Sequence, residues 1–245
     1  MKNLYLHIGL GKTGSSALQS WLSLNSSTLL RQGYSYADLV PEAKLGKVSS
    51  GNGYVLFVAL RNSDYAEAER LITESYFASG CERAIVSCEL LQNLARPKLQ
   101  ILQEICARHD IQVTVIAYVR SFYEHLYSTY AQHVKQGSVS HAFGSDPDDL
   151  DTYKYVEVLM KYARYFRDHF VVLNYNDPGR DVFTSFAAAV GVDTVGISRL
   201  SAAVNRSLTI GEVDALRQIN ALHGGEFSRR ISDYLAEQFP DRRSE

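Results

Sequence analysis

Small, hydroxyl-bearing and basic residues follow the first apolar segment of the chain and have the makings of an anion site. The run reads Gly9-Leu10-Gly11-Lys12-Thr13-Gly14-Ser15-Ser16, and a helical pattern begins near Ala17. Glycines let successive backbone N–H groups turn toward one ligand, the first amides of a helix are unpaired, and Lys12 adds a full positive charge. The serine and threonine hydroxyls can add further donors. The run therefore predicts a phosphate-binding loop.

This loop differs from the Walker A loop of nucleotide hydrolases, which reads G-x-x-x-x-G-K-[ST]. The glycine that opens that motif would fall at position 6, where the chain has Leu6 inside a strand-like segment. Gly14 and a pair of serines follow Lys12-Thr13. The residues favour phosphate binding and argue against hydrolysis of ATP.

A second basic position follows a strongly β-branched segment, Gln112 to Val119. Arg120 comes directly after it, and Ser128 stands eight residues later on a helical pattern. An arginine at the carboxyl end of a strand offers a fork of donors to phosphate, and a serine adds one more. A surface arginine and an ordinary helix serine would give the same spacing by chance, so the pair gains its meaning from the first loop.

Glu89 is the first candidate for a general base. It follows the segment Arg83 to Ser87, which places a carboxylate at the carboxyl end of a predicted strand, where open α/β sheets bind their ligands. A glutamate within reach of an alcohol can take its proton. A glutamate that merely favours the start of the next helix would fit the same pattern. His7 is the second candidate base, although a lone histidine in a strand is more often structural.

These residues resemble the sulfotransferases that use 3′-phosphoadenosine 5′-phosphosulfate (PAPS), in particular the bacterial and carbohydrate-type members. Lys12 to Ser16 match that family's 5′-phosphosulfate loop, P-K-T-G-T/S-T/S, with Gly11 in place of proline. Arg120 and Ser128 match its 3′-phosphate residues, and Ser87-Cys88-Glu89 matches a Ser-x-Glu sequence that carries the base. Segments 153–175, 181–191 and 205–209 extend the resemblance over nearly the whole chain.

The resemblance implies a reaction and a set of site residues. PAPS would be the co-substrate and 3′-phosphoadenosine 5′-phosphate (PAP) the product, without a metal, and Lys12 and Glu89 would be catalytic. The implied nucleotide-binding residues are Gly11, Lys12, Thr13, Gly14, Ser15, Ser16, Arg120, Ser128 and Arg206. Ala17 stands where one branch of the family has an adenine-stacking tryptophan, so the adenine contact is unassigned, and we expect Trp21 to be a core residue.

Two other functions remain open at this stage. A small P-loop kinase or NTPase would share the strand, loop and helix, but it requires Mg²⁺ and an acidic ligand for that ion. A nucleotide- or glycan-binding protein could keep the fold without catalysis. The presence of Lys12, Glu89, Arg120 and Ser128 together argues against that reading. The histidines show no metal-ligand spacing such as H-E-x-x-H, so no metal site is predicted.

Short apolar segments alternate with longer amphipathic ones, a pattern typical of parallel α/β proteins. Strands are predicted over 3–9, 83–87, 112–119 and 169–173, and helices over 15–31, 97–108, 121–135, 152–168, 177–190 and 226–239. A capping box at Thr209 to Glu212 predicts a further helix. We therefore expect one α/β domain over 1–245, P-loop-NTPase-like, with a mostly parallel central sheet flanked by helices and a helical C-terminal part. Segments 33–61 and 136–151 lack strong periodicity and are candidate substrate-recognition loops or plain surface loops.

Composition restricts the partners and the location. The 245 residues carry 25 basic and 27 acidic side chains without a long like-charge run, which argues against nucleic acid as a partner. No signal-peptide layout or membrane-spanning apolar stretch occurs, so we expect a cytoplasmic protein. The odd set Cys81, Cys88 and Cys106 predicts reduced thiols in or near the core. The expected acceptor is a hydroxyl or amine of a small molecule, a lipid or a saccharide.

Overall fold

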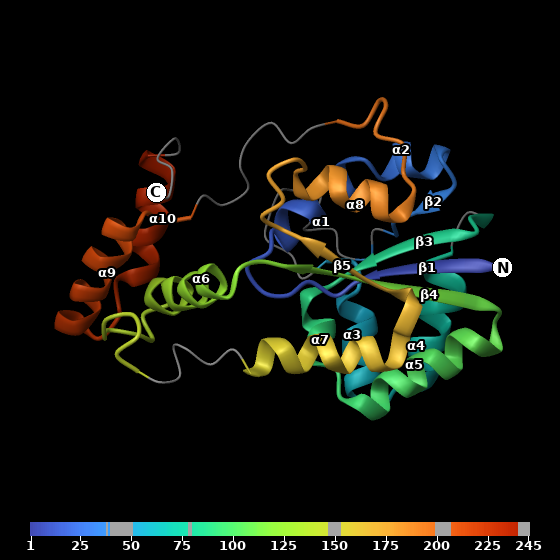
Figure 1. The fold of residues 1–245 in the computed structure, drawn as a ribbon, viewed down its shortest axis with the longest axis horizontal. Coiled ribbons are helices and arrows are strands. Elements are labelled where there is room, and N and C mark those ends of the chain that lie inside the picture. Colours follow the sequence, from blue (N-terminus) through green and yellow to red (C-terminus); the bar gives the residue numbers. More distant parts are fainter. Residues whose placement is uncertain (38, 40–50, 78–79, 147–152, 199–206, 240–245) are drawn as a thin grey trace. The chain divides into compact units, whose positions relative to one another are not determined.

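The structure is a computed structural model that describes residues 1–37, 39, 51–77, 80–146, 153–198 and 207–239 (Figure 1). The chain forms two compact units, which are described one at a time. Unit 1 comprises Met1–Arg120 and Tyr155–Ser201, and unit 2 comprises Ser121–Lys154 and Ala202–Glu245. No helix in the described ranges is both long and apolar enough to cross a membrane.

Unit 1 is built on a five-stranded sheet in the order β2-β3-β1-β4-β5. Every neighbouring pair of strands is parallel. The strands are β1 Lys2–His7, β2 Tyr34–Ser35, β3 Arg83–Ser87, β4 Ile111–Val119 and β5 Phe170–Asn174. The predicted α/β class with a parallel central sheet is confirmed, and β1 lies at its centre.

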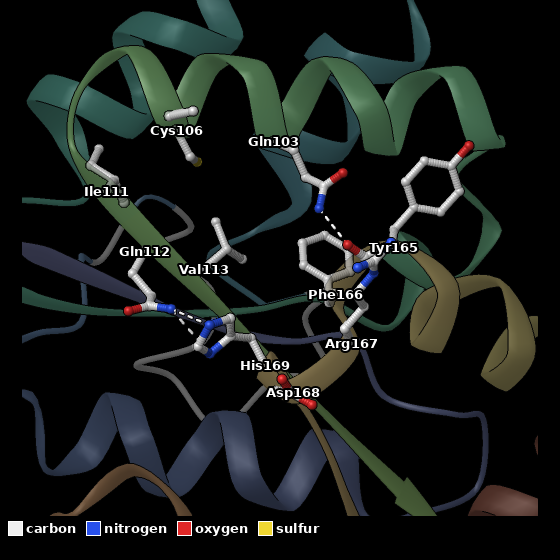
Figure 2. Close-up of a pocket in the computed structure, with 11 residues that line it drawn as sticks. Gln103, Cys106, Ile111, Gln112, Val113, Tyr165, Phe166, Arg167, Asp168 and His169 are labelled. Atoms are coloured by element: carbon white, nitrogen blue, oxygen red, sulfur yellow. Dashed lines mark hydrogen bonds between the residues drawn. The ribbon is translucent and has the colours of Figure 1, made fainter.

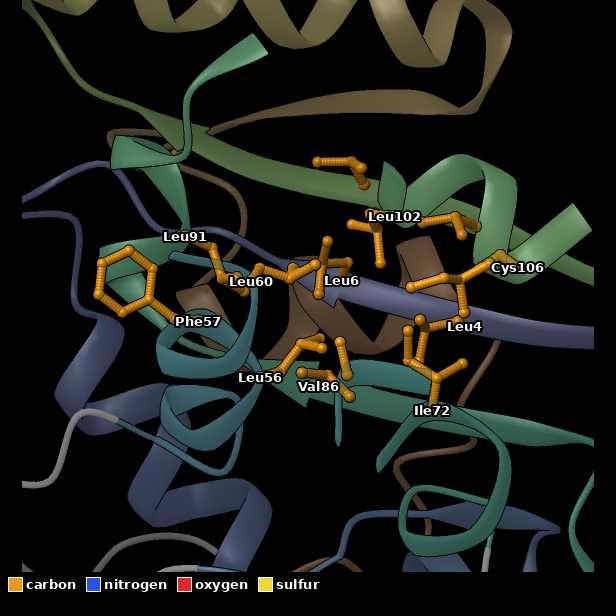
Figure 3. Packing of buried hydrophobic residues seen from close by; sticks show 14 of the residues in the cluster. Leu4, Leu6, Leu56, Phe57, Leu60, Ile72, Val86, Leu91, Leu102 and Cys106 are labelled. Carbon is orange, nitrogen blue, oxygen red and sulfur yellow. The ribbon is translucent and has the colours of Figure 1, made fainter. Parts of the chain in front are cut away.

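Both faces of the sheet are covered by helices, because alternate side chains of each strand point to opposite sides. Leu4, Leu6 and Val86 pack into one hydrophobic cluster, part of which Figure 3 shows. The helices over this face, all visible on one side of the sheet in Figure 1, are α3 Tyr54–Arg61, α4 Tyr65–Arg70, α5 Arg96–Arg108 and α7 Tyr153–Phe166. Ile85 and Ile116 point the other way, into a second cluster. That face is covered by α1 Ser15–Leu24, α2 Ser26–Arg31 and α8 Val182–Val190.

Two helix boundaries differ from the predictions for local chemical reasons. The predicted helix 15–31 is divided at Asn25, whose Nδ2 donates to the Trp21 carbonyl at 2.9 Å. The predicted start of a helix at 177 is wrong, because α8 begins at Val182 after Asp181 accepts from the Thr184 backbone N–H at 2.7 Å. Gly191, with φ 77°, ends α8 as predicted.

The segment 33–61 contains regular structure that the sequence analysis missed. It holds β2 and α3, and α4 and the π-helical turn η2 (Leu71–Ser75) follow it. The strand β2 has only two residues and gives no periodic signal. The sequence of α3, YVLFVALR, is apolar on nearly all sides, so it lacks the contrast that marks an amphipathic helix. The interpretation of the whole segment as a loop is therefore wrong.

The segment around Asn52 completes the outer edge of β3. The strand β2 pairs with Arg83 and Ala84, and the residues that the structure describes supply no strand partner for the rest of that edge. The Asn52 side chain takes its place, because Nδ2 donates to the Ile85 carbonyl at 3.0 Å and Oδ1 accepts from the Ser87 N–H at 2.8 Å. The Gly53 N–H then donates to the Ser87 carbonyl at 3.1 Å. A side-chain amide thus continues the hydrogen-bond pattern of the sheet up to the end of β3.

The described part of unit 2 is helical. It consists of α6 Phe122–Lys135, α9 Ile210–His223 and α10 Ser228–Gln238, and Tyr130, Val134, Val213 and Leu216 form its hydrophobic cluster. The predicted capping box is present, since the Thr209 N–H donates to Glu212 Oε2 at 2.8 Å and the Glu212 N–H donates to Thr209 Oγ1 at 3.2 Å. The helical C-terminal part is confirmed for these residues.

Candidate functional site

The carboxyl ends of β1 and β4 meet where the connections of the chain diverge. The two strands are neighbours, but the chain leaves β1 toward β2 on one side of the sheet and leaves β4 toward β5 on the other. Ligands of open α/β sheets bind in the crevice outside such a switch point. The predicted loop follows β1 and Arg120 follows β4, so the fold brings both to this point.

The backbone of the loop after β1 turns in the way that an anion site needs. Gly9, Lys12 and Gly14 have φ angles of 48°, 66° and 75°, in the left-handed region. Gly14 is the N-cap residue of α1, and it has no side chain that could accept from the first amides of this helix. These amides are suited to donate to an anion.

Two hydroxyls of the loop are used differently. Thr13 is fully buried, and its Oγ1 donates to the Leu10 carbonyl at 2.5 Å, which closes the loop on itself. Ser15 is only 5% exposed, and its Oγ has no hydrogen-bond partner within the described residues. An unpaired buried hydroxyl costs about 1–3 kcal/mol. The Ser15 hydroxyl thus marks a place where a ligand acceptor would be stabilising.

Arg120 connects the second predicted anion position with the first. Its Nη1 donates to the Lys12 carbonyl at 3.0 Å, and its backbone N–H donates to the Tyr155 hydroxyl at 3.1 Å. Its guanidinium carbon lies 5.2 Å from the centre of the Tyr175 ring. Arg120 therefore contacts the loop that carries Lys12, and the shared role of these two cationic residues in binding an anion stays a prediction.

Tyr175 is a site residue that the sequence analysis missed. Its backbone N–H donates to the Val119 carbonyl at 2.7 Å, which extends the pairing of β4 with β5. Its ring covers Gly14 so closely that a Cβ there would come within 2.9 Å of Cε2. A larger residue at position 14 would displace the ring. Its position in the sequence could have identified it, because Tyr175 directly follows β5 just as Arg120 directly follows β4.

Glu89 borders the same loop. It is the first residue of the short 3₁₀ helix η4 (Glu89–Asn93), after β3 and Cys88. The Cys88 N–H donates to the His7 carbonyl at 3.0 Å, so β3 stays paired with β1 up to this point. A Cβ built on Gly9 would lie 3.2 Å from the Glu89 Cβ. Among the residues that the structure describes, the Glu89 carboxylate has no hydrogen-bond or ion-pair partner. Glu89 is thus half-buried beside the loop that follows β1, and its carboxylate is available to accept a proton.

His7 lies behind this site. Its ring is fully buried, and Nδ1 is 2.8 Å from the Ser87 Oγ, which also accepts from Gln19 Nε2 at 3.3 Å. Burial lowers the pKa of His7 to about 4, so the ring is neutral at pH 7. An acceptor bound at the loop has no access to this ring, and the geometry therefore favours Glu89 over His7 as the base.

The other predicted residues have different outcomes. Gly11 and Ser16 lie half-buried in the loop and the first turn of α1. Ser128 lies half-buried on α6 of unit 2, and its place at the site stays a prediction. Arg206 lies outside the described residues. Trp21 is a core residue as predicted, because it is 3% exposed and its ring stacks on Phe183 at 5.6 Å.

A hollow adjoins the site, and another lies far from it. The first, of about 510 Å³, is lined by Tyr175 and residues 177–182. The second, of about 420 Å³, lies at the opposite edge of the sheet, where β4 begins (Figure 2). There Gln103 Nε2 donates to the Tyr165 carbonyl at 2.5 Å, and Gln112 Nε2 lies 3.0 Å from His169 Nδ1. No residue predicted to do chemistry lines this second hollow.

The three cysteines are buried and carry no disulfide, as predicted. Comparison with known proteins does not assign the chain to a family, since no family model matches it and no curated protein is significantly similar to it in sequence. The chemistry of the site is thus argued from its own residues. Amides at the start of α1, Lys12 and Arg120 can bind an anionic ligand, and Glu89 can accept a proton beside it.

Proposed function

We propose that this protein is a sulfotransferase that moves a sulfuryl group from PAPS to a hydroxyl or amine of a small-molecule, lipid or saccharide acceptor. The observation that carries the proposal is that three elements lie together at the carboxyl ends of β1, β3 and β4. They are the start of α1 after Gly14 with Lys12, the Arg120 guanidinium on the Lys12 carbonyl, and, beside Gly9, Glu89, whose carboxylate has no partner among the described residues. The 5′-phosphosulfate of PAPS would bind at the first element and its 3′-phosphate at the second. The hydroxyl or amine of the acceptor would give its proton to the third element, Glu89.

The position of Thr13 favours this donor over ATP. In a Walker A loop, the serine or threonine after the lysine places its hydroxyl on Mg²⁺. Thr13 holds that place in the sequence, but it is fully buried and its hydroxyl donates to the Leu10 carbonyl at 2.5 Å. A kinase would need this side chain to turn outward. A donor that needs no metal at this hydroxyl fits the loop as it stands.

The proposed reaction is an in-line transfer. The acceptor oxygen or nitrogen forms a bond to sulfur while Glu89 takes its proton, and the bond from sulfur to the 5′-phosphate oxygen breaks. PAP leaves with that electron pair, and Lys12 stabilises the charge on the sulfuryl group and the departing oxygen. The amides and hydroxyls of Ser15 and Ser16 hold the 5′-phosphate. Arg120 holds the 3′-phosphate, and the contributions of Ser128 and Arg206 stay predictions from the sequence.

We further propose that unit 1 is P-loop-NTPase-like. The support is the central parallel strand β1, the phosphate-type loop that follows it, and the helix α1 that begins directly after Gly14. The hydrogen bond from Thr13 to the Leu10 carbonyl closes this loop, a contact that the sequence alone does not indicate. A phosphate held by this loop would lie on the axis of α1, where the helix dipole favours negative charge.

Calorimetry with PAP, adenosine 5′-phosphate and ATP with Mg²⁺ tests the proposed function. PAP is expected to bind at least about tenfold tighter than the monophosphate without any metal, which corresponds to about 1.4 kcal/mol. Tighter binding of ATP with Mg²⁺ would contradict the sulfotransferase and support a kinase. Tight PAP binding without PAPS turnover toward alcohols, amines or water would instead support a binding protein without catalysis.

A further inference from the structure

Glu89 has a position that its own side chain does not fix. Its carboxylate makes no hydrogen bond or ion pair within the described part of the chain. The backbone of η4, which Glu89 begins, must therefore set where the carboxylate points. A five-residue 3₁₀ helix has poor hydrogen-bond geometry and little stability of its own, so other elements have to hold it.

We propose that Lys161 and Tyr162, neighbours on α7, are positioning residues that hold η4 and thereby aim Glu89 at the acceptor. The inference rests on the proposed function, in which Glu89 is the base. The Tyr162 hydroxyl donates to the Leu91 carbonyl at 2.5 Å. Lys161 Nζ donates to the Gln92 carbonyl and to the Leu94 carbonyl, each at 2.8 Å. Two adjacent side chains thus bind two carbonyls of η4 and the carbonyl of Leu94, the residue that follows it.

The chemistry of both donors suits this task. Carbonyls at the end of a helical turn carry partial negative charge, and an ammonium group there is favourable. Lys161 is half-buried and burial lowers its pKa, and two of its three donors are satisfied by carbonyls. Tyr162 is fully buried, and burial raises the pKa of its hydroxyl far above the usual value, so it stays protonated and can only donate to a carbonyl. The hydrogen bond from Tyr162 therefore does not depend on a charge change near pH 7.

The hydrophobic core also anchors η4, through Leu91. The Leu91 side chain is fully buried and lies beside Phe57 and Leu60 in the cluster of Figure 3. Its carbonyl is the one that receives the Tyr162 hydroxyl. The buried Leu91 side chain fixes η4 against the hydrophobic core, and Lys161 and Tyr162 fix the C-terminal part of η4. Glu89, at its N-terminal end, can then move little relative to Gly9.

Such a clamp matters for catalysis because a general base must come within about 2.6–3.2 Å of the proton that it takes. A shift of about 1 Å at a reacting group can lower a rate by about a hundredfold. Loosening of η4 would therefore slow proton transfer while leaving the nucleotide loop, which α1 carries, unchanged. This split distinguishes a positioning role from a general loss of stability.

Cys88 supplies a test that does not require the proposed function. It directly precedes Glu89, it is fully buried, and burial raises the pKa of its thiol to about 11. Its reaction with iodoacetamide, followed by peptide mass spectrometry, therefore reports opening of this turn. Lys161→Met keeps the length of the side chain but removes the ammonium, and Tyr162→Phe removes only a hydroxyl. We expect both to react at Cys88 at least about tenfold faster than the wild type.

The matched control is Arg164→Met, which removes an exposed cation from the same helix. It should leave the rate at Cys88 within about twofold of the wild type. Cys106, fully buried on α5, serves as the internal reference within each sample. Wild-type labelling of Cys88 in both Lys161→Met and Tyr162→Phe would overturn the clamp. Faster labelling at Cys106 as well would mean that the whole of unit 1 opens, and it would also overturn it.

The second measurement is single-turnover cleavage of PAPS with water as the acceptor, together with PAP binding. We expect Lys161→Met to lower the cleavage rate at least about tenfold while the Kd for PAP stays within about twofold. An unchanged rate with faster Cys88 labelling would overturn the positioning role. If the wild type neither binds PAP nor cleaves PAPS, the proposed function fails, and the labelling result still decides whether α7 holds the turn.

Discussion

The Arg120 guanidinium donates to the Lys12 carbonyl across 3.0 Å, so the carboxyl end of β4 holds the loop that follows β1. Lys12 has a φ of 66°, a conformation that costs a residue with a side chain roughly 1–2 kcal/mol. The hydrogen bond from Arg120 is one interaction that offsets this cost. Arg120 is therefore expected to act both on the loop and on the ligand.

Replacing Arg120 by glutamine should weaken binding of PAP more than binding of adenosine 5′-phosphate. A charge-assisted hydrogen bond contributes about 1.5–3 kcal/mol, so we expect PAP to lose about tenfold to a hundredfold in affinity. Calorimetry measures both ligands. The control is Arg167→Gln, an exposed arginine at the opposite edge of the sheet. Equal losses for both ligands would show that Arg120 supports the loop without reading the 3′-phosphate.

Lys12→Ala should lower PAPS turnover by about a hundredfold or more, because a cation that stabilises developing charge acts mainly in the transition state. The effect on PAP affinity should be much smaller than the effect on rate. Lys98→Ala, at a half-buried lysine that donates to Ser63 and Tyr65, is the control. Unchanged turnover in Lys12→Ala would remove Lys12 from the catalytic set.

Glu89→Gln keeps the shape of the side chain but cannot accept the proton. General-base catalysis contributes about a hundredfold to ten-thousandfold, so a comparable loss in turnover is expected, with PAP affinity retained. Glu82→Gln, on an exposed residue just before β3, provides the comparison. If Glu89→Gln is as active as the wild type, another group and not Glu89 is the general base.

His7 should make stability depend on pH. Burial lowers its pKa from 6.5 to about 4, so the unfolded chain binds the proton more readily between these values. Stability is then fully present above pH 6.5 and falls as the pH drops toward 4, by about 3 kcal/mol at about 1.4 kcal/mol per pKa unit. Urea unfolding from pH 7 to pH 4 should show a shallower loss for His7→Gln than for the exposed control His133→Gln. Parallel curves for the two variants would contradict the assignment.

Asn52→Leu should destabilise unit 1. Asn52 is 3% exposed, and its amide satisfies the Ile85 carbonyl and the Ser87 N–H. Two buried backbone groups without partners cost about 1–3 kcal/mol each, so we expect a loss of about 2–6 kcal/mol in urea unfolding. Asn62→Leu, on an exposed asparagine after α3, should change stability by less than about 0.5 kcal/mol. A small effect at Asn52 would mean that the strand edge finds other partners.

The strands could be predicted because both faces of the sheet are buried, which makes each strand a short apolar run. The segment 83–87 was predicted with its observed bounds, and 112–119 differs from β4 by one residue. The missed β2 and α3 lack a periodic signal, and they form because tertiary partners stabilise them. The start of α8 was misplaced because Asp177-Pro178 imitates a helix start that Asp181 provides.

The candidate site shows the same division. Residues that follow strands in the sequence, such as Lys12, Glu89 and Arg120, could be identified because parallel strands bring their carboxyl ends together. The contacts between them could not, because they join residues far apart in the chain. The Thr13 hydrogen bond that closes the loop and the Tyr175 ring over Gly14 depend on side-chain directions that no spacing specifies.

The Asn52 amide on β3 also bears on how this protein avoids association. An open strand edge is a template on which another polypeptide can add by hydrogen bonding, the first step of edge-to-edge aggregation. Beyond Ala84, the outer edge of β3 would be such a template, but Asn52 and Gly53 occupy its donors and acceptors. The backbone groups of Ile85 and Ser87 are therefore already paired where β3 ends beside Glu89, so a second strand could not bind to them.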